Sequence, residues 1–219
     1  MPVSVIIGCG GLAREVYESI EAMTYASTEF LREPPEELAA VLASSIRFWS
    51  EIPTDAAPDG QPLYRPTQDD DAIVAIGDTR TRKRIMETLP VATWFCVYDQ
   101  EATRRETDRE RMVAVGCYVG ASAVVGPNVY LGRGVVIDVG ATVAHDCVLF
   151  DYSHVCPQAN LCGGVEIGEG SFVGASAVVL PKVKIGAWAT IGAGAVVTKN
   201  VPPGETWVGN PARLMVPRW

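Results

Sequence analysis

The 219-residue chain is 48% hydrophobic and 20% charged, with a net charge of −8 and a pI near 4.8. This composition predicts a packed core and excludes a disordered chain. The acidic balance argues against nucleic acid or a membrane surface as the main partner, and no apolar run is long enough to span a bilayer. Six cysteines without a CxxC pair, and a start without a charged leader, predict reduced thiols and a cytoplasmic location.

The first stretch, "VSVIIGCGGLAREVYESIEAM", predicts a strand, a glycine turn and a helix. Gly8, Gly10 and Gly11 form the turn, and the G-x-G-x-x-A spacing lets a phosphate approach N–H groups at the helix start. We therefore expect a nucleotide phosphate here, with a plain strand–helix turn as the alternative. Residues 24–42 predict a loop and then a helix, so the acidic strand end that an NAD site requires is missing.

Two more strands and one helix complete the predicted first domain. "DAIVAIGDTRTRKRIMETL" predicts a strand over residues 72–76 and a helix over 79–89, and "VATWFCV" predicts a third strand. The polar segment 98–111 marks the join to the second half. We expect a Rossmann-like α/β domain over residues 1–100 and a different domain over residues 101–219.

A strict six-residue repeat organises the second half. Aliphatic residues recur at every sixth position without insertion, at Val113, Val119, Val125, Leu131, Ile137, Val143, Leu149, Val155, Leu161, Ile167, Val173, Val179, Ile185, Ile191 and Val197. The residue four places after each is small or β-branched. A period of six does not fit a helix, whereas short strands joined by tight turns fit it, each making one side of a prism.

This pattern resembles the hexapeptide-repeat family, whose fold is a left-handed parallel β-helix with three hexapeptides to a coil. Fifteen hexapeptides would then give about five coils. The resemblance also implies trimers with acyl-CoA in a groove between neighbouring prisms. The ending "VPPGETWVGNPARLM" is similar to the loop and tail of that family.

The front "IIGCGGLAREV", followed by repeats carrying "HDC…D..H..P", resembles a narrower group: the nucleotide-aminosugar N-acetyltransferases and the sialic acid O-acetyltransferases. The match covers nearly the whole chain but fails over residues 25–70. There the group has a second strand ending in paired aspartates that meets the nucleotide base. Residues 46–55 could be a displaced version of that strand.

The resemblance assigns roles to individual residues. His145 corresponds to the proposed general base and Asp146 to the acid beside it. The cofactor positions are His154, Gly163 and Ala175, with the Gly163 amide meeting the thioester carbonyl. Asp138 corresponds to the polar residue near the sugar amine, and Asp78 to part of the "GNN" segment of the sugar-binding domain.

The residues themselves favour His145 as a base. An imidazole titrates near neutral pH, which suits removal of the proton from an attacking amine, and a carboxylate beside it orients the ring. A metal site needs three or four ligands, and two histidines without supporting spacing predict none. His154 is left between a structural role and a place beside the cofactor.

We therefore expect an acetyl-CoA-dependent N-acetyltransferase that acts by direct transfer on a nucleotide-linked aminosugar, most simply a 4-amino-4,6-dideoxyhexose. Its partners would be that sugar and further copies of the chain in a homotrimer. The alternatives are a sugar (sialic acid) O-acetyltransferase and a catalytically silent trimer that binds nucleotide sugars.

Overall fold

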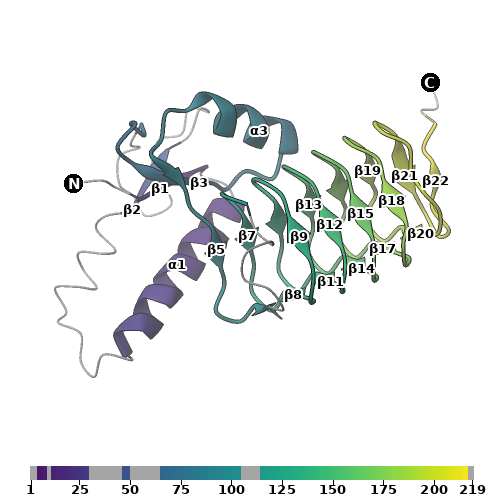
Figure 1. The fold of residues 1–219 in the computed structure, drawn as a ribbon, viewed down its shortest axis with the longest axis horizontal. Coiled ribbons are helices and arrows are strands. Elements are labelled where there is room, and N and C mark those ends of the chain that lie inside the picture. Colours follow the sequence, from purple (N-terminus) through teal and green to yellow (C-terminus); the bar gives the residue numbers. More distant parts are fainter. Residues whose placement is uncertain (1–3, 9–10, 30–45, 50–64, 105–113, 217–219) are drawn as a thin grey trace.

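The computed structural model describes residues 4–8, 11–29, 46–49, 65–104 and 114–216. A small α/β domain sits at one end, and a long β-helix extends from it towards the C-terminus (Figure 1). Among the described helices, none has the length and apolar character needed to cross a membrane.

A parallel sheet forms the centre of the N-terminal domain. Its elements run β1 (Ser4–Ile7), α1 (Gly11–Glu29), β2 (Ile46–Trp49), β3 (Asp71–Val74), α3 (Thr79–Thr88) and β4 (Thr93–Trp94). The sheet order is β2-β1-β3-β4, and every neighbouring pair is parallel. The predicted α/β architecture is confirmed, and residues 46–49 do supply a second strand. The loop predicted from residue 24 was wrong because nothing in "TYASTE" stops a helix, so α1 continues to Glu29.

Helices α1 and α3 cover opposite faces of this sheet (Figure 1). Strand side chains alternate between faces. Ile6 and Ile73 therefore pack with Val16 of α1, whereas Ile7 and Val74 share a cluster with Ile85 of α3.

The repeat folds into a parallel β-helix with three sheets, as predicted. The first sheet contains β5 (Val97–Tyr98), β7 (Tyr118–Val119), β10 (Val136–Ile137), β13 (His154–Val155), β16 (Phe172–Val173), β19 (Thr190–Ile191), β21 (Thr206–Val208) and the antiparallel β22 (Arg213–Leu214). The second contains β6 (Thr103–Arg104), β8 (Val124–Val125), β11 (Thr142–Val143), β14 (Asn160–Leu161), β17 (Val178–Val179) and β20 (Val196–Val197). The third contains β9 (Tyr130–Leu131), β12 (Val148–Leu149), β15 (Glu166–Ile167) and β18 (Lys184–Ile185).

The six-residue period has a direct structural cause. Every described position of the aliphatic series, from Val119 to Val197, points into the prism and is at most 3% exposed. Between strands, one residue in six has a left-handed backbone, with φ of 60° at Asp146 and 66° at Gly194. The repeated left-handed residue turns the chain at each corner, and glycine or a polar residue occupies most of these positions, with Tyr152 and Trp188 as aromatic exceptions.

The strand predicted over residues 91–97 divides between the two domains. β4 pairs with β3 in the α/β sheet, and β5 pairs with β7 in the β-helix. The domain boundary at residue 100, together with the left-handed sense and the number of coils, stays a proposal.

Helix α3 joins the domains by lying against one corner of the prism. Thr79 Oγ1 donates to the carbonyl of Gly170 at 3.0 Å, and Lys83 Nζ lies 2.6 Å from Glu169 Oε1. A methyl group at Gly134 would come within 2.7 Å of Met86 Sδ. Glycine at this corner therefore lets the helix approach the β-helix closely.

Candidate active site

His145 and Asp146 form an exposed pair in the turn between β11 and β12. The ring Nδ1 lies 2.7 Å from Asp146 Oδ2, and the side chains are 64% and 56% exposed. The hydrogen bonds from His145 and then from Asn128 hold the pKa of Asp146 below its usual value. Asp146 is therefore ionised at neutral pH and accepts from Nδ1–H, which leaves Nε2 as the basic nitrogen of the neutral ring.

Gly163 lies against the His145 ring in the next coil. A Cβ at residue 163 would come within 2.6 Å of both Cε1 and Nε2 of His145. The backbone below it is fixed because Gly164 N–H donates to the His145 carbonyl at 2.9 Å. The structure thus brings the predicted base and the predicted oxyanion-binding residue together, and only glycine leaves room for the ring.

His154 and Asp138 form a second, buried pair. His154 Nε2 lies 2.7 Å from Asp138 Oδ2, and the residues are 4% and 7% exposed. On the other side of the ring, Nδ1 lies 3.0 Å from the carbonyl oxygen of Gly77, in the loop between β3 and α3. The rings of His154 and Phe172 pack in a T-shaped arrangement, with their centroids 5.2 Å apart. A predicted cofactor residue and a predicted substrate residue are therefore partners at the domain junction.

This pair holds one proton more than a neutral ring and a carboxylate would. The Gly77 carbonyl can only accept, so His154 Nδ1 is the donor. The short contact between Nε2 and Oδ2 would then join two acceptors. A further proton must lie between them, on the imidazole or on the carboxyl group.

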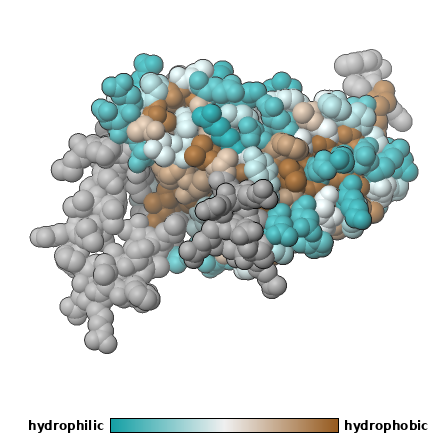
Figure 2. Space-filling model, in the orientation of Figure 1, coloured by the Kyte–Doolittle hydropathy of each residue, from teal (hydrophilic) through white to brown (hydrophobic). Residues whose placement is uncertain are grey.

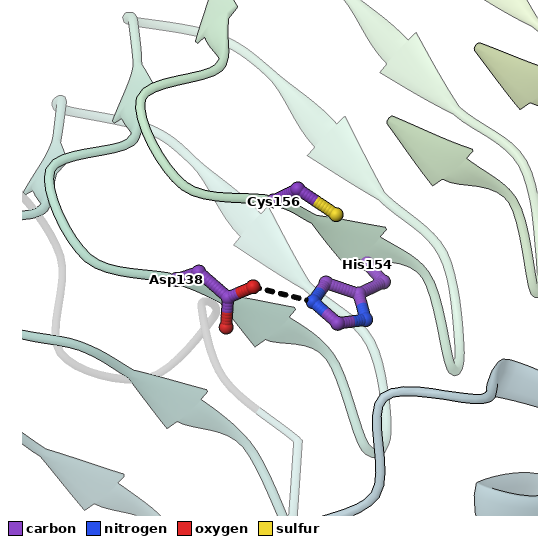
Figure 3. A group of neighbouring side chains, drawn as sticks. All are labelled: Asp138, His154 and Cys156. Atoms are coloured by element: carbon purple, nitrogen blue, oxygen red, sulfur yellow. Dashed lines mark hydrogen bonds and ion pairs between the residues drawn. The ribbon is translucent and has the colours of Figure 1, made fainter. Parts of the chain in front are cut away.

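Cys156 lies beside this pair (Figure 3). Among the described residues, ligand atoms of Asp138, His154 and Cys156 lie within 4.8 Å of one another, a spacing that could hold a metal ion. Burial, however, raises the pKa of the Cys156 thiol to about 12, and the buried guanidinium of Arg82 is electrostatically coupled to both Asp138 and Cys156. A fixed positive charge this close to the three side chains repels a second cation, so Arg82 supports the metal-free prediction.

The glycine turn is described only in part. Gly8 has φ of 133°, and a Cβ there would lie 2.6 Å from the Ala75 carbonyl oxygen, so glycine is required at this position. Gly11 begins α1 and has open space around it. Gly10 lies outside the described residues. The phosphate role of this turn stays a prediction.

Asp78 and Ala175, two further predicted site residues, lie apart from each other and from the His145 turn. Asp78 caps α3 by accepting from Thr81 N–H at 2.7 Å, and that bond lowers the pKa of its carboxyl group. It also borders a cleft of about 270 Å³ between α3 and the β-helix, lined by Gly77, Asp78, Thr79, Arg80, Gly170, Phe172, Trp188 and Thr190. Ala175 lies in the turn between β16 and β17, where its carbonyl accepts from Gly194. Gly163 lies in the turn between β14 and β15, so these two predicted cofactor residues are at different corners of the prism.

Known proteins share both halves of this chain. Residues 5–89 match the PglD N-terminal domain, and residues 164–199 match the bacterial transferase hexapeptide family (six repeats). A GDP-perosamine N-acetyltransferase of Escherichia coli O157:H7 is 34% identical over 147 residues, which is 65% of this chain and 66% of that protein, just under two thirds of its length.

Solved structures match over almost the full length. The acetyltransferase domain of PglB from Neisseria gonorrhoeae FA1090, in complex with acetyl coenzyme A, is 28% identical with a TM-score of 0.78, covering 97% of this chain and 98% of that one. A mutant perosamine N-acetyltransferase from Caulobacter crescentus, in complex with CoA and GDP-perosamine, is 26% identical with a TM-score of 0.78, covering 99% and 98%.

The chain therefore carries a PglD-type N-terminal domain and a hexapeptide-repeat segment, and it is homologous to proteins that are named as acetyltransferases. Two of these relatives were solved with acetyl coenzyme A or CoA bound, which supports acetyl-CoA as the cosubstrate. The match also agrees with the order of the parts, an α/β domain followed by a β-helix.

In this chain, the two histidine pairs lie on different sides of one prism. His145 is in the turn where the second and third sheets meet, whereas His154 lies on β13 of the first sheet and Asp138 directly follows β10 of the same sheet. A corner between two faces of a triangular prism lies opposite the third face. The predicted base and the predicted substrate residue of one chain therefore do not share a site.

Sequence reasoning missed Arg82. It is fully buried in α3, and its guanidinium contacts carbonyl groups of both domains. A basic residue in "TRTRKRI" reads as part of a solvated helix face, and no residue pattern marks it as buried. Only the docking of α3 on the prism reveals its role.

Proposed function

We propose that this acetyltransferase transfers the acetyl group of acetyl-CoA to the amino group of a nucleotide-linked aminosugar, with His145 as general base. The observation that carries the proposal is the His145–Asp146 pair, held directly over Gly163. Relatives named for perosamine, one of them bound to CoA and GDP-perosamine, support a substrate of the 4-amino-4,6-dideoxyhexose type.

The reaction follows from the protonation state of the pair. Asp146 holds the proton of His145 on Nδ1, so Nε2 accepts the proton of the amine as its nitrogen attacks the thioester carbonyl. The tetrahedral oxyanion then needs a donor, and the Gly163 backbone amide at the same corner is our candidate. Collapse of the intermediate breaks the carbon–sulfur bond, and CoA leaves as its thiol after it takes up a proton.

The separation of the two pairs supports the homotrimer. Asp138, His154, Gly77 and Asp78 lie where the nucleotide-sugar domain meets its own prism. His145 of the same chain lies at the far corner, so a neighbouring copy must supply it to that junction. Apolar residues gather on the visible side of the β-helix (Figure 2) and are a candidate subunit interface.

The Asp138 carboxyl group is our candidate contact for the sugar amine. Its Oδ1 atom is buried and has no hydrogen-bond partner within the described structure. A buried acceptor of this kind is costly unless a donor reaches it. An amino group brought there by the sugar would satisfy it.

The direct test mixes the purified protein with acetyl-CoA and GDP-perosamine, and with UDP- and dTDP-linked aminosugars in parallel, while a thiol reagent measures released CoA. We expect thiol release with one nucleotide class and a product heavier by one acetyl group. Thiol release only with a sialic acid or another amine-free sugar would instead establish the O-acetyl alternative. If no thiol were released with either set of sugars, the protein would more simply be a trimer that binds nucleotide sugars without catalysis.

A further inference from the structure

We propose that Arg82 is a positioning residue that sets the substrate-binding loop at Gly77 and Asp78 against the Asp138–His154 pair. The inference rests on the proposed function for the identity of the loop's ligand. Its physical basis, a buried guanidinium shared between two domains, is independent of that function.

The guanidinium of Arg82 donates to both sides of the domain junction. Nη1 lies 2.6 Å from the carbonyl oxygen of Ile76 and 3.3 Å from that of Gly77, both in the loop that follows β3. On the β-helix side, Nε lies 2.9 Å from the carbonyl oxygen of Gly134. Nη2 lies 2.8 Å from the carbonyl oxygen of Tyr152 and 3.3 Å from that of Ser153.

The β-helix carbonyls that Arg82 binds precede the strands that carry the second pair. Gly134 lies just before β10, which leads directly into Asp138, and Ser153 lies just before β13, which begins with His154. The Gly77 carbonyl is also shared, because it accepts from both Arg82 and His154. Arg82 therefore connects the loop, both strands and the histidine through one rigid planar group.

Such an arrangement is costly for a group that serves only to fill space. Arg82 is 0% exposed, and none of the hydrogen bonds above goes to a carboxylate. Burial lowers the pKa of the guanidinium to about 10, so it stays charged at neutral pH. A planar fork of five N–H donors matches this set of carbonyls, and a lysine ammonium, with three donors around one nitrogen, does not.

Arg82→Lys tests the proposal because it keeps the charge and loses the fork. With GDP-perosamine as the probe, we expect its KM to rise about tenfold or more, while the KM of acetyl-CoA stays within about twofold. Lys83→Met is the matched control, since it removes another contact between α3 and the prism, the ion pair with Glu169, without touching Gly77. It should leave both KM values within about twofold. Equal changes of both KM values in Arg82→Lys would overturn the proposal.

A second readout does not depend on turnover. The chain has two histidines, so ¹⁵N-histidine labelling gives a simple spectrum. We expect the Nδ1–H signal of His154 to shift and to exchange faster with water in Arg82→Lys, and to be unchanged in Lys83→Met. An unchanged His154 signal in a folded Arg82→Lys protein would overturn the positioning role. Failure of wild-type turnover would count against the proposed function alone.

Should Arg82→Lys not fold, the wild-type protein carries the test. The Arg82 Nε–H signal should exchange slowly with water, and still more slowly when GDP-perosamine is added, because the ligand would hold the loop in place. Slow exchange that GDP-perosamine leaves unaltered would show a purely structural arginine and overturn the proposal.

Discussion

Nε2 of His154 lies 2.7 Å from Oδ2 of Asp138, while Nδ1 of the same ring donates to a backbone carbonyl. The two residues therefore share a proton in a buried place where the two domains meet. With asparagine at residue 138, a side-chain N–H could donate to Nε2 without the extra proton. With aspartate at residue 138, the hydrogen bond between the two side chains forms only when the pair holds this additional proton.

We expect this shared proton to be visible by NMR. The wild-type protein should show a protonated His154 Nδ1 and a second, strongly deshielded proton between Nε2 and Oδ2, both protected from exchange by burial. Asp138→Asn should remove the second signal and keep the first. His145→Ala assigns the spectrum because it leaves one histidine. A His154 ring protonated at Nε2 and bare at Nδ1 would contradict the hydrogen bond to Gly77.

His145→Ala should lower the rate of acetyl transfer roughly a hundredfold or more, because the amine loses its proton acceptor. The side chain is exposed and packs in no core cluster, so folding should be unaffected. The mass of the assembly and the affinity for CoA serve as controls. Activity close to that of the wild type would remove His145 as the base.

Gly163→Ala should displace the His145 ring, since the new methyl group would lie within 2.6 Å of Cε1 and Nε2. A shift of the base by about 1 Å can cost up to about a hundredfold in rate. We expect kcat to fall and the thermal midpoint to change little.

Gly164→Ala is the neighbouring control. Its φ is +71°, and an added Cβ would lie 3.4 Å from Lys182 Cγ, so the substitution strains the backbone and leaves the His145 ring free. It should lower the thermal midpoint more than it lowers kcat. If Gly164→Ala lowered kcat more than Gly163→Ala did, the space at Gly163 would not be what sets the position of the His145 ring.

If Asp138 of one copy and His145 of a neighbouring copy form one active site, mixing the Asp138→Ala and His145→Ala chains should restore activity. Asp138→Ala should raise the KM of the aminosugar more than that of acetyl-CoA, and His145→Ala should lower kcat. When both chains are co-expressed and assembled together, some junctions combine an intact Asp138 with an intact His145 from the other chain. Activity above that of either variant alone, measured at low aminosugar concentration, is expected. No gain in verified mixed assemblies would mean that one chain builds the site alone.

Cys156 should resist alkylation in the folded protein. Burial raises its thiol pKa from 9.0 to about 12, so the thiolate fraction at pH 8 is about a thousandfold lower than in the unfolded chain. The folded state therefore binds the thiol proton more strongly, and its stability should fall as the pH rises from about 9 towards 12. Mass spectrometry of iodoacetamide-treated protein, native and in urea, measures the first effect. Equal labelling in both states would contradict the burial of this thiol.

Much of this molecule follows from sequence alone. The period of six determined the prism because a strand that points one side chain inward at each turn needs an aliphatic residue at that spacing, and Val119 to Val197 are all buried as expected. The same frame points Val143 inward and places His145, two residues later, in a turn at a corner of the prism. Both are local consequences of chain geometry.

The tertiary structure decided which distant residues meet. His154 was ambiguous in sequence because its partners are Asp138 in the previous coil and Gly77 in another domain. Arg82 looked like one of several basic residues on a helix, and only the packing of α3 against the prism enclosed it among carbonyl groups. Contacts across a domain junction depend on how two folded surfaces fit, and residue spacing along one element does not encode that fit.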